Sequence, residues 1–271
     1  MNFRSVKIPF FDNLKAIMDL NIYLKAYTPI TLADMEDVKL MKRFDTKYLM
    51  NIADLPDILK AASSSYKILE IGGKRISRYL TYYYDTDTLH MYQMHHNGCL
   101  NRYKIRKRTY MDSDLHFLEV KYKSNKGKTF KKRKSLDEAP LLTETSAQFI
   151  KDCTPYCEDE LLEILTVAFS RITLVNISTK ERVTIDIDLN FSDNKQSVNT
   201  PSIVIIEIKK EKRADNTVFC SILKEHKIYP FRISKYCTGL LLLYKNTIKY
   251  NRFKEKIRKL EEISHGNIAA I

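Results

Sequence analysis

The chain has few of the residues that mark linkers, membrane spans or secretion signals. Its 271 residues include 6 Gly and 7 Pro, which leaves little room for flexible linkers. The longest apolar run covers only residues 239–243, far short of the roughly 20 residues that a membrane span needs. The N-terminus lacks a sustained apolar segment followed by a small-residue cleavage site, so we expect no signal peptide.

Cysteine is also scarce, with five residues scattered along the chain. An odd, dispersed set is typical of reduced thiols and predicts a cytoplasmic protein. Cys153 and Cys157 are close in sequence but have no nearby His or second Cys pair, so they do not indicate a zinc site. Because 44% of the residues are hydrophobic and 11% are aromatic, the chain can build a substantial core.

Positive charge is what the chain has in excess. It carries 46 Lys and Arg against 33 Asp and Glu, a formal net charge of +13. This balance implies a polyanionic partner: nucleic acid, an anionic membrane or a phosphate-rich small substrate. Composition alone does not choose among the three.

The positive charge follows strand-like segments. In residues 102–123, two alternating runs flank a turn at 111–114. Because strand side chains alternate between two faces, Lys104, Arg106 and Arg108 share one face, and the other face is mostly apolar. The same alternation of charged and apolar positions recurs in other segments: 41–50, 129–136, 181–191 and 202–210.

The pattern predicts an α+β protein with eight or nine strands. Short turns join most of the strands, so we expect an antiparallel sheet, with a closed barrel as the favoured form. We expect helices over 30–41, 55–63, 143–168, 216–227, 235–246 and 250–262. The expected organisation is a partly helical N-terminal extension (1–40), a β domain (41–246) and a basic C-terminal helix with a tail (247–271).

The charged strand faces have two interpretations. An ordinary solvated surface around one apolar core would place them outside. The helical segments favour the opposite arrangement, because their apolar stripes need the apolar face of the sheet as a surface to cover. Two like charges ~7 Å apart repel by roughly 2 kcal/mol at an effective dielectric constant near 20, so an inner set of cations needs a bound anion. Polyphosphate groups suit such a set, since Arg binds their oxygens in a fork.

The acids on these faces leave alternatives open. Glu207 shares a face with Lys209 and is either a salt-bridge partner or the holder of a divalent metal that bridges to phosphate. Asp45, Asp186 and Asp188 are open in the same way, whereas Glu119 is interpreted as a salt-bridge partner. Nucleic-acid binding is disfavoured, because the cations alternate with apolar residues and no aromatic stacking platform lies among them.

Seven segments occur in a recognisable order: RFDTKYLM, YYYDTDTLHMY, KIRKRTY, FLEVKYK, ERVTIDIDLNF, IVIIEIKK and RISKYCTG. Together, from about residue 40 to 245, they resemble the VTC-type polyphosphate polymerase domain of the triphosphate tunnel metalloenzyme superfamily. The resemblance implies a closed antiparallel eight-stranded β tunnel with helices packed outside. Its lumen would bind a triphosphate-like chain.

The resemblance also implies an activity. Enzymes of this kind transfer the γ-phosphoryl group of ATP to a growing polyphosphate chain with a divalent metal, Mn²⁺ or Mg²⁺. We therefore expect an ATP-dependent polyphosphate polymerase whose partners are ATP and inorganic polyphosphate, with no nucleic acid. A chain without a membrane span of its own leaves room for a membrane-protein partner. Two alternatives stay open: a hydrolase of tripolyphosphate or nucleoside triphosphates, and a non-catalytic polyphosphate-binding module.

The resemblance assigns catalytic roles to five residues. Arg106 and Arg108 match the strand arginines that grip the phosphates. Lys47 and Lys121 match lysines of the first and fifth strands. Lys235 matches a lysine at the start of the closing helix.

Glu207 matches the metal-ligating glutamate of the family. Many tunnel enzymes carry Glu-x-Glu-x-Lys on the first strand, where this chain has Arg43, Asp45 and Lys47. The missing acid argues against a triphosphatase with two firmly held metals. Face parity adds a set of expected phosphate-binding residues: Arg43, Lys104, Lys123, Lys131, Arg133, Arg171, Arg182 and Lys209.

Overall fold

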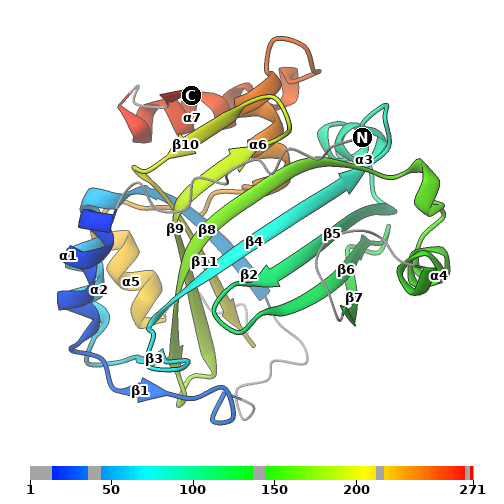
Figure 1. Cartoon of the computed structure of the whole chain (residues 1–271). Coiled ribbons are helices and arrows are strands. Elements are labelled where there is room, and N and C mark those ends of the chain that lie inside the picture. The colour runs from blue at the N-terminus through cyan, green and yellow to red at the C-terminus, as the bar shows by residue number, and fades with distance from the viewer. Residues whose placement is uncertain (1–13, 36–43, 137–143, 212–216, 266–268, 271) are drawn as a thin grey trace.

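One curved, mostly antiparallel sheet forms the body of the protein, with helices against both of its faces (Figure 1). A computed structural model describes residues 14–35, 44–136, 144–211, 217–265 and 269–270. Within these residues the sheet has 12 strands. None of the described helices is long and apolar enough to span a membrane.

Eight strands follow one antiparallel path in the order β2-β11-β9-β8-β4-β5-β6-β7. Their bounds are β2 Phe44–Asn51, β4 Ile76–Asp85, β5 Arg102–Tyr110, β6 Leu115–Lys123, β7 Thr129–Leu136, β8 Leu162–Asn176, β9 Glu181–Ser192 and β11 Ile203–Lys210. Four short strands lie at the margins: β1 Pro29–Ile30, β3 Lys67–Leu69, β10 Ser197–Thr200 and β12 Ala269–Ala270. The seven α-helices are α1 Leu14–Leu24, α2 Leu55–Ala62, α3 His90–His96, α4 Glu144–Cys153, α5 Val218–Glu225, α6 Lys235–Tyr244 and α7 Lys254–Ser264. Short 3-10 turns cover Ile52–Asp54, Glu158–Glu160 and Asn251–Phe253.

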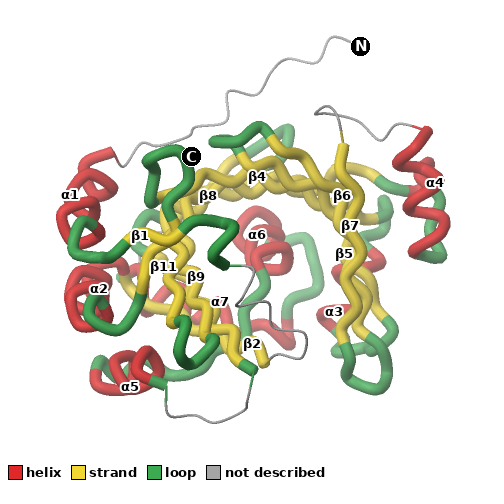
Figure 2. The backbone as a smooth tube through the Cα atoms, turned by 90° about the horizontal axis from the view of Figure 1, so that it is seen from below, coloured by secondary structure: helices red, strands yellow, loops and turns green. Residues whose placement is uncertain are grey.

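The expectation of an antiparallel sheet with helices is confirmed. Among the described residues the sheet curves into an arch (Figure 2). β2 and β7 end the path, and the described residues form no ladder between these two strands. Closure into an eight-stranded tunnel is therefore not found among these residues, and the sheet has four short strands besides the eight of the path. Alternation along a strand shows which face is buried, but it carries no information on whether two edge strands meet. β7 is largely exposed and rich in Lys, as edge strands of native sheets often are.

The outer, convex face of the arch is apolar and covered by helices. Helices α1, α2 and α5 pack against β2, β8, β9 and β11 in one buried cluster that includes Leu59, Phe219, Ile185 and Ile206. Helix α4 covers β5 and β6 on the same side, in a second cluster of buried side chains. Each such side chain contributes roughly 1.5–3 kcal/mol when fully buried. This arrangement places the charged strand faces on the inside of the arch, as the helical segments predicted.

Helix α6 lies inside the arch, although the sequence predicted only outer helices (Figure 2). Its residues Leu240 and Leu241 pack with Phe169, Leu189 and Phe191 in a third buried cluster. One end of the inner face is apolar and filled by α6, and the other end is charged. On β2, β8 and β11 the apolar residues Leu49, Phe169 and Ile205 simply have the same parity as the charged inner residues of their strands. On β9 a bulge contributes: the β8–β9 register shifts between Ala168 and Ser170, with the extra residue on β9, so that Leu189 and Phe191 turn to the inner face.

One helix expected from the sequence is wrong in its extent, and another lies half outside the described residues. The segment 143–168 forms α4 only as far as Cys153, and β8 begins at Leu162. Apolar residues between these points look helical in spacing, but pairing of β8 with both β4 and β9 decides the structure. In the segment 30–41, Ile30 belongs to β1 and residues 32–35 form a turn, whereas residues 36–41 lie outside the described residues, so that the helix expected there stays a prediction beyond residue 35. The expected division into an extension, a β domain and a C-terminal helix stays a prediction.

Candidate anion-binding site

Buried ion pairs occupy the deep part of the inner face. Glu119 of β6 has a side chain only 2% exposed and lies opposite Arg106 of β5. The Arg106 guanidinium donates to the carboxylate from Nε at 2.7 Å, and the ammonium group of Lys131 forms a second ion pair with it. Although burial opposes ionisation, Arg106, Arg108 and Lys131 lower the pKa of Glu119 to about 2. The interpretation of Glu119 as a salt-bridge partner is confirmed.

A second buried carboxylate joins the sheet to α6. Asp186 of β9 accepts two hydrogen bonds from Arg171 of β8, at 2.5 and 2.8 Å, in a fork geometry. Lys235, the first residue of α6, pairs with the same carboxylate, and its Nζ lies 4.4 Å from the ring centroid of Phe169. Burial lowers the pKa of Lys235 to about 7, partly against the attraction of Asp186. Of the two interpretations of Asp186, the structure shows charge balance.

Glu207 of β11 lies between two lysines. Its Oε1 is 3.5 Å from Nζ of Lys47 on β2, and Lys209 binds its other oxygen. Burial would raise the pKa of Glu207, but Lys47 and Lys209 hold it well below the usual range. The carboxylate is ionised and therefore suitable for a cation, although its oxygens already have partners.

The described residues offer no group of three or more His, Cys, Asp or Glu side chains for a metal. A resident ion with several protein ligands therefore does not fit these residues. An ion such as Mg²⁺ that is bound by one carboxylate and by substrate phosphates fits Glu207.

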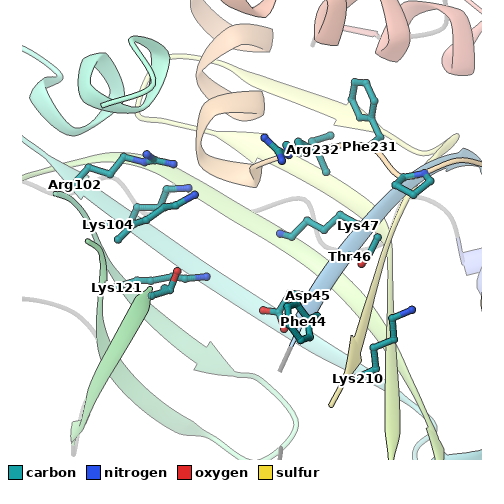
Figure 3. Close-up of a pocket in the computed structure, with 14 residues that line it drawn as sticks. Phe44, Asp45, Thr46, Lys47, Arg102, Lys104, Lys121, Lys210, Phe231 and Arg232 are labelled. Atoms are coloured by element: carbon teal, nitrogen blue, oxygen red, sulfur yellow. The ribbon is translucent and has the colours of Figure 1, made fainter. Parts of the chain in front are cut away.

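A cavity of about 730 Å³ opens beside these ion pairs (Figure 3). Asp45 is the one carboxylate in its lining. Its basic lining residues come from β2, β5, β6, β11 and the segment before α6: Lys47, Arg102, Lys104, Lys121, Lys123, Lys210 and Arg232. Within the part of the chain that is described, five of these form no ion pair: Arg102, Lys104, Lys121, Lys123 and Arg232. The uncompensated positive charge marks the cavity as an anion-binding site.

Burial and mutual repulsion both oppose the positive charge of the lysines in this cavity. Burial lowers the pKa of Lys104 to about 7, and repulsion from Lys47, Lys121 and Arg102 adds to the effect. Burial and Lys47 likewise lower the pKa of Lys121. Nζ of Lys104 donates to the hydroxyl of Ser234, which caps α6, at 2.9 Å. A bound anion would relieve the repulsion among these groups.

Most of the residues expected at the site lie on the inner face. Arg108 is 7% exposed, donates to Thr81 and lies over the ring of Tyr79. Arg133 lies over the ring of Phe117, and Arg182 is opposite Lys209 in the β9–β11 ladder. Arg43 lies outside the described residues. The roles assigned to these residues stay predictions.

Three basic residues of the cavity lining were missed by the sequence analysis: Arg102, Lys210 and Arg232. Arg102 has the same parity as Lys104 on β5, so face parity would have found it. Lys210 is the last residue of β11, where parity assigned only Lys209 to the inner face. Arg232 lies outside any periodic segment, and only the path of the chain from β11 to α6 brings it to the cavity.

The family follows from a comparison with known proteins. A model of the VTC domain matches residues 42–244, which is most of the chain. The chain belongs to the VTC domain family. The family to which the seven ordered segments pointed is thereby confirmed. No curated protein matches the sequence.

Solved structures resemble this VTC domain at low sequence identity. A putative adenylyl cyclase from Hippeastrum, described as having a dominant triphosphatase activity, has a TM-score of 0.46 and 12% identity, over 73% of this chain and 95% of that one. A putative adenylate cyclase from Vibrio parahaemolyticus has a TM-score of 0.44 and 8% identity, over 72% and 97%. The PH1819 protein from Pyrococcus horikoshii OT3 has a TM-score of 0.41 and 13% identity, over 74% and 99%.

Proposed function

We propose that this VTC domain is a polyphosphate polymerase, which transfers the γ-phosphoryl group of ATP to the end of a growing inorganic polyphosphate chain. The observation that supports this most is the basic cavity, whose lining holds five cations without an ion-pair partner among the described residues. A polyphosphate chain carries the matching negative charge along its length. Family membership favours the same substrate class.

Each part of the inner face has a role in this proposal. Lys104 and Lys121 hold the phosphates of the substrate, and Arg106 and Arg108 extend this grip toward the centre of the arch. Lys235 lies where the capped start of α6 approaches the same face. Phosphoryl transfer spreads charge over the transferring oxygens, so positioned cations lower its barrier without a side-chain nucleophile. The terminal phosphate of the chain is the attacking group.

Glu207 is the residue that would hold a divalent metal, Mn²⁺ or Mg²⁺, together with the substrate phosphates. Such an ion neutralises phosphate charge in the transition state. The pairs that Glu207 forms with Lys47 and Lys209 keep its carboxylate ionised and oriented before substrate arrives.

Incubation of the purified chain with ATP and Mn²⁺ or Mg²⁺, followed by gel analysis for long-chain polyphosphate, tests the proposal. The Lys121→Ala variant should lose product formation by at least tenfold, because a phosphate contact worth about 1.4 kcal/mol or more is removed. Lys132→Ala is the matched control, since Lys132 is an exposed lysine of the neighbouring strand on the other face. If the wild-type chain makes no polyphosphate with any metal or acceptor, the polymerase proposal is wrong.

The two alternative functions give different results in the same assay. Release of phosphate from ATP or tripolyphosphate without chain growth would indicate a hydrolase. Anion binding without turnover would indicate a binding module. The Glu207→Gln variant separates catalysis from binding, since loss of turnover with retained tripolyphosphate binding supports an enzyme. A cytoplasmic location and a membrane-protein partner stay predictions.

A further inference from the structure

A second group of cations lies at the edge of the cavity, where the C-terminal segment packs. Arg102 of β5, Lys123 of β6 and Arg232 line the cavity. Lys256 of α7 is close enough to Arg232 and Arg102 for their charges to oppose its own. We call these four residues the mouth cluster. None of them forms an ion pair with a described residue. The groups that favour the charge of Lys256 are the buried thiol of Cys237 and the exposed carboxylate of its neighbour Glu255.

The register of β5 and β6 sets the position of this cluster relative to the cavity lysines. Lys104 and Lys121 are directly opposite each other, and Arg102 and Lys123 form the next inward-facing pair. Two residues along a strand correspond to about 7 Å. The basic surface therefore extends about 7 Å outward from Lys104 and Lys121, toward α7.

Helix α7 is fixed against the body of the protein. Phe253, just before α7, is 4% exposed and packs against His96 and Tyr92, with ring centroids 5.0 and 6.1 Å apart. Asn51 of β2 donates to the carbonyl oxygen of Ile263 at 2.6 Å. Nζ of Lys256 lies 4.3 Å from the ring centroid of Phe253. Phe253 also packs edge-on against His95, with ring centroids 6.1 Å apart, and the ring of His95 contacts the thiol of Cys237 in the first turn of α6. Because Ser234 at the start of that turn accepts from Lys104, these contacts place Lys256 near the end of the cavity where α6 begins and make it a positioned charge.

We infer that the mouth cluster is an additional anion subsite, which binds phosphate groups of a polyphosphate chain beyond the reacting triphosphate. The inference rests on the proposed function and deepens it. The mouth cluster continues the row that begins with Lys104 and Lys121, so one extended polyanion contacts both the cluster and these two lysines. A triphosphate held at Lys104 and Lys121 does not reach the mouth cluster. Lys256 lies outside residues 42–244, which are those that the family matches. The C-terminal helix thereby contributes to substrate recognition.

Binding measurements with three probes test the inference: tripolyphosphate, ATP and long-chain polyphosphate, each at several salt concentrations. Lys256→Ala should weaken long-chain binding by about fivefold to tenfold and make its salt dependence less steep, because one phosphate contact is lost. Binding of tripolyphosphate and ATP should be unchanged. Lys256→Arg should bind the long chain as the wild type does. Arg258→Ala is the matched control, since Arg258 is on the same helix with a side chain 75% exposed.

The outcomes distinguish this inference from the proposed function. If the wild type binds none of the three probes, the proposed function fails and the inference with it. If the wild type binds long chains and Lys256→Ala binds them equally well, only the inference fails. An equal loss with Arg258→Ala would mean a general effect of surface charge, and an equal loss for ATP or tripolyphosphate would assign Lys256 to the triphosphate site. Either result overturns the inference.

Discussion

The buried carboxylate of Glu119 gives the sharpest test of how the inner face is built. The Glu119→Gln substitution keeps the shape of the side chain and removes the negative charge shared by Arg106 and Lys131. The pKa of Glu119 is lowered from 4.5 to about 2 in the folded protein. At about 1.4 kcal/mol per pKa unit, this corresponds to about 3 kcal/mol of stability at neutral pH. Loss of one partner from a buried ion pair typically destabilises a protein by about 3–5 kcal/mol, which agrees.

The pH dependence has a definite sign. Because the folded pKa of Glu119 lies below the unfolded value, the stabilisation is complete above about pH 5 and is lost as the pH falls toward about 2. The wild type should therefore exceed Glu119→Gln in free energy of unfolding by about 3 kcal/mol at pH 7, and by less than half of that near pH 3. Urea denaturation at several pH values measures both differences. A variant as stable as the wild type at pH 7, or a difference that does not depend on pH, would refute the reasoning.

The same substitution should strengthen anion binding. In the wild type, a phosphate competes with Glu119 for Arg106 and Lys131, and in the variant this competition is absent. Tripolyphosphate should thus raise the melting temperature of Glu119→Gln by more than that of the wild type. Glu181→Gln is the matched control, because Glu181 is a fully buried carboxylate that accepts a hydrogen bond from Tyr66, a member of the outer cluster. Equal ligand effects in the two variants would show that the anion does not reach Arg106 and Lys131.

Three further substitutions probe other contacts. Since the pKa of Lys104 is about 7, tripolyphosphate affinity measured by calorimetry should fall between pH 7 and 9. Lys104→Arg should remove this pH dependence. The same pH profile in both proteins would contradict the role of Lys104 as the titrating anion-binding group. Asp186→Asn leaves Arg171 and Lys235 without their counter-ion and should lower the free energy of unfolding, measured by urea denaturation, by about 3–5 kcal/mol. Tripolyphosphate should restore part of this stability. Unaltered stability would argue against an ion pair shared by Arg171 and Lys235. Gly239→Ala should lower the free energy of unfolding by about 1–3 kcal/mol, because the new methyl group would lie 2.6 Å from Cδ2 of Leu165. Unchanged stability would mean that α6 shifts easily against the inner face of the sheet.

The sequence by itself determined which face of the sheet is charged. Alternation with a period of two is a local property of each strand, so Lys104, Arg106 and Arg108 had to share a face wherever β5 lay. The outer helices followed from the same pattern, because the opposite face offered a continuous apolar surface for them to cover. The order of the charged strands also identified the family. The same reasoning could have predicted that Arg102 lines the cavity, since it has the same parity as Lys104.

Only the tertiary structure decided how these faces meet. Whether β2 and β7 pair depends on twist and curvature summed over the whole sheet, and the sequence of a single strand does not determine that sum. The bulge in the β8–β9 ladder turned Leu189 and Phe191 to the inner face, where they pack against α6. Partner choice between distant charges is likewise a three-dimensional property. The structure joins Glu119 to Arg106 and Lys131. Five of the seven basic residues in the cavity lining form no ion pair with a described residue, because contact across strands depends on register and not on spacing along the chain.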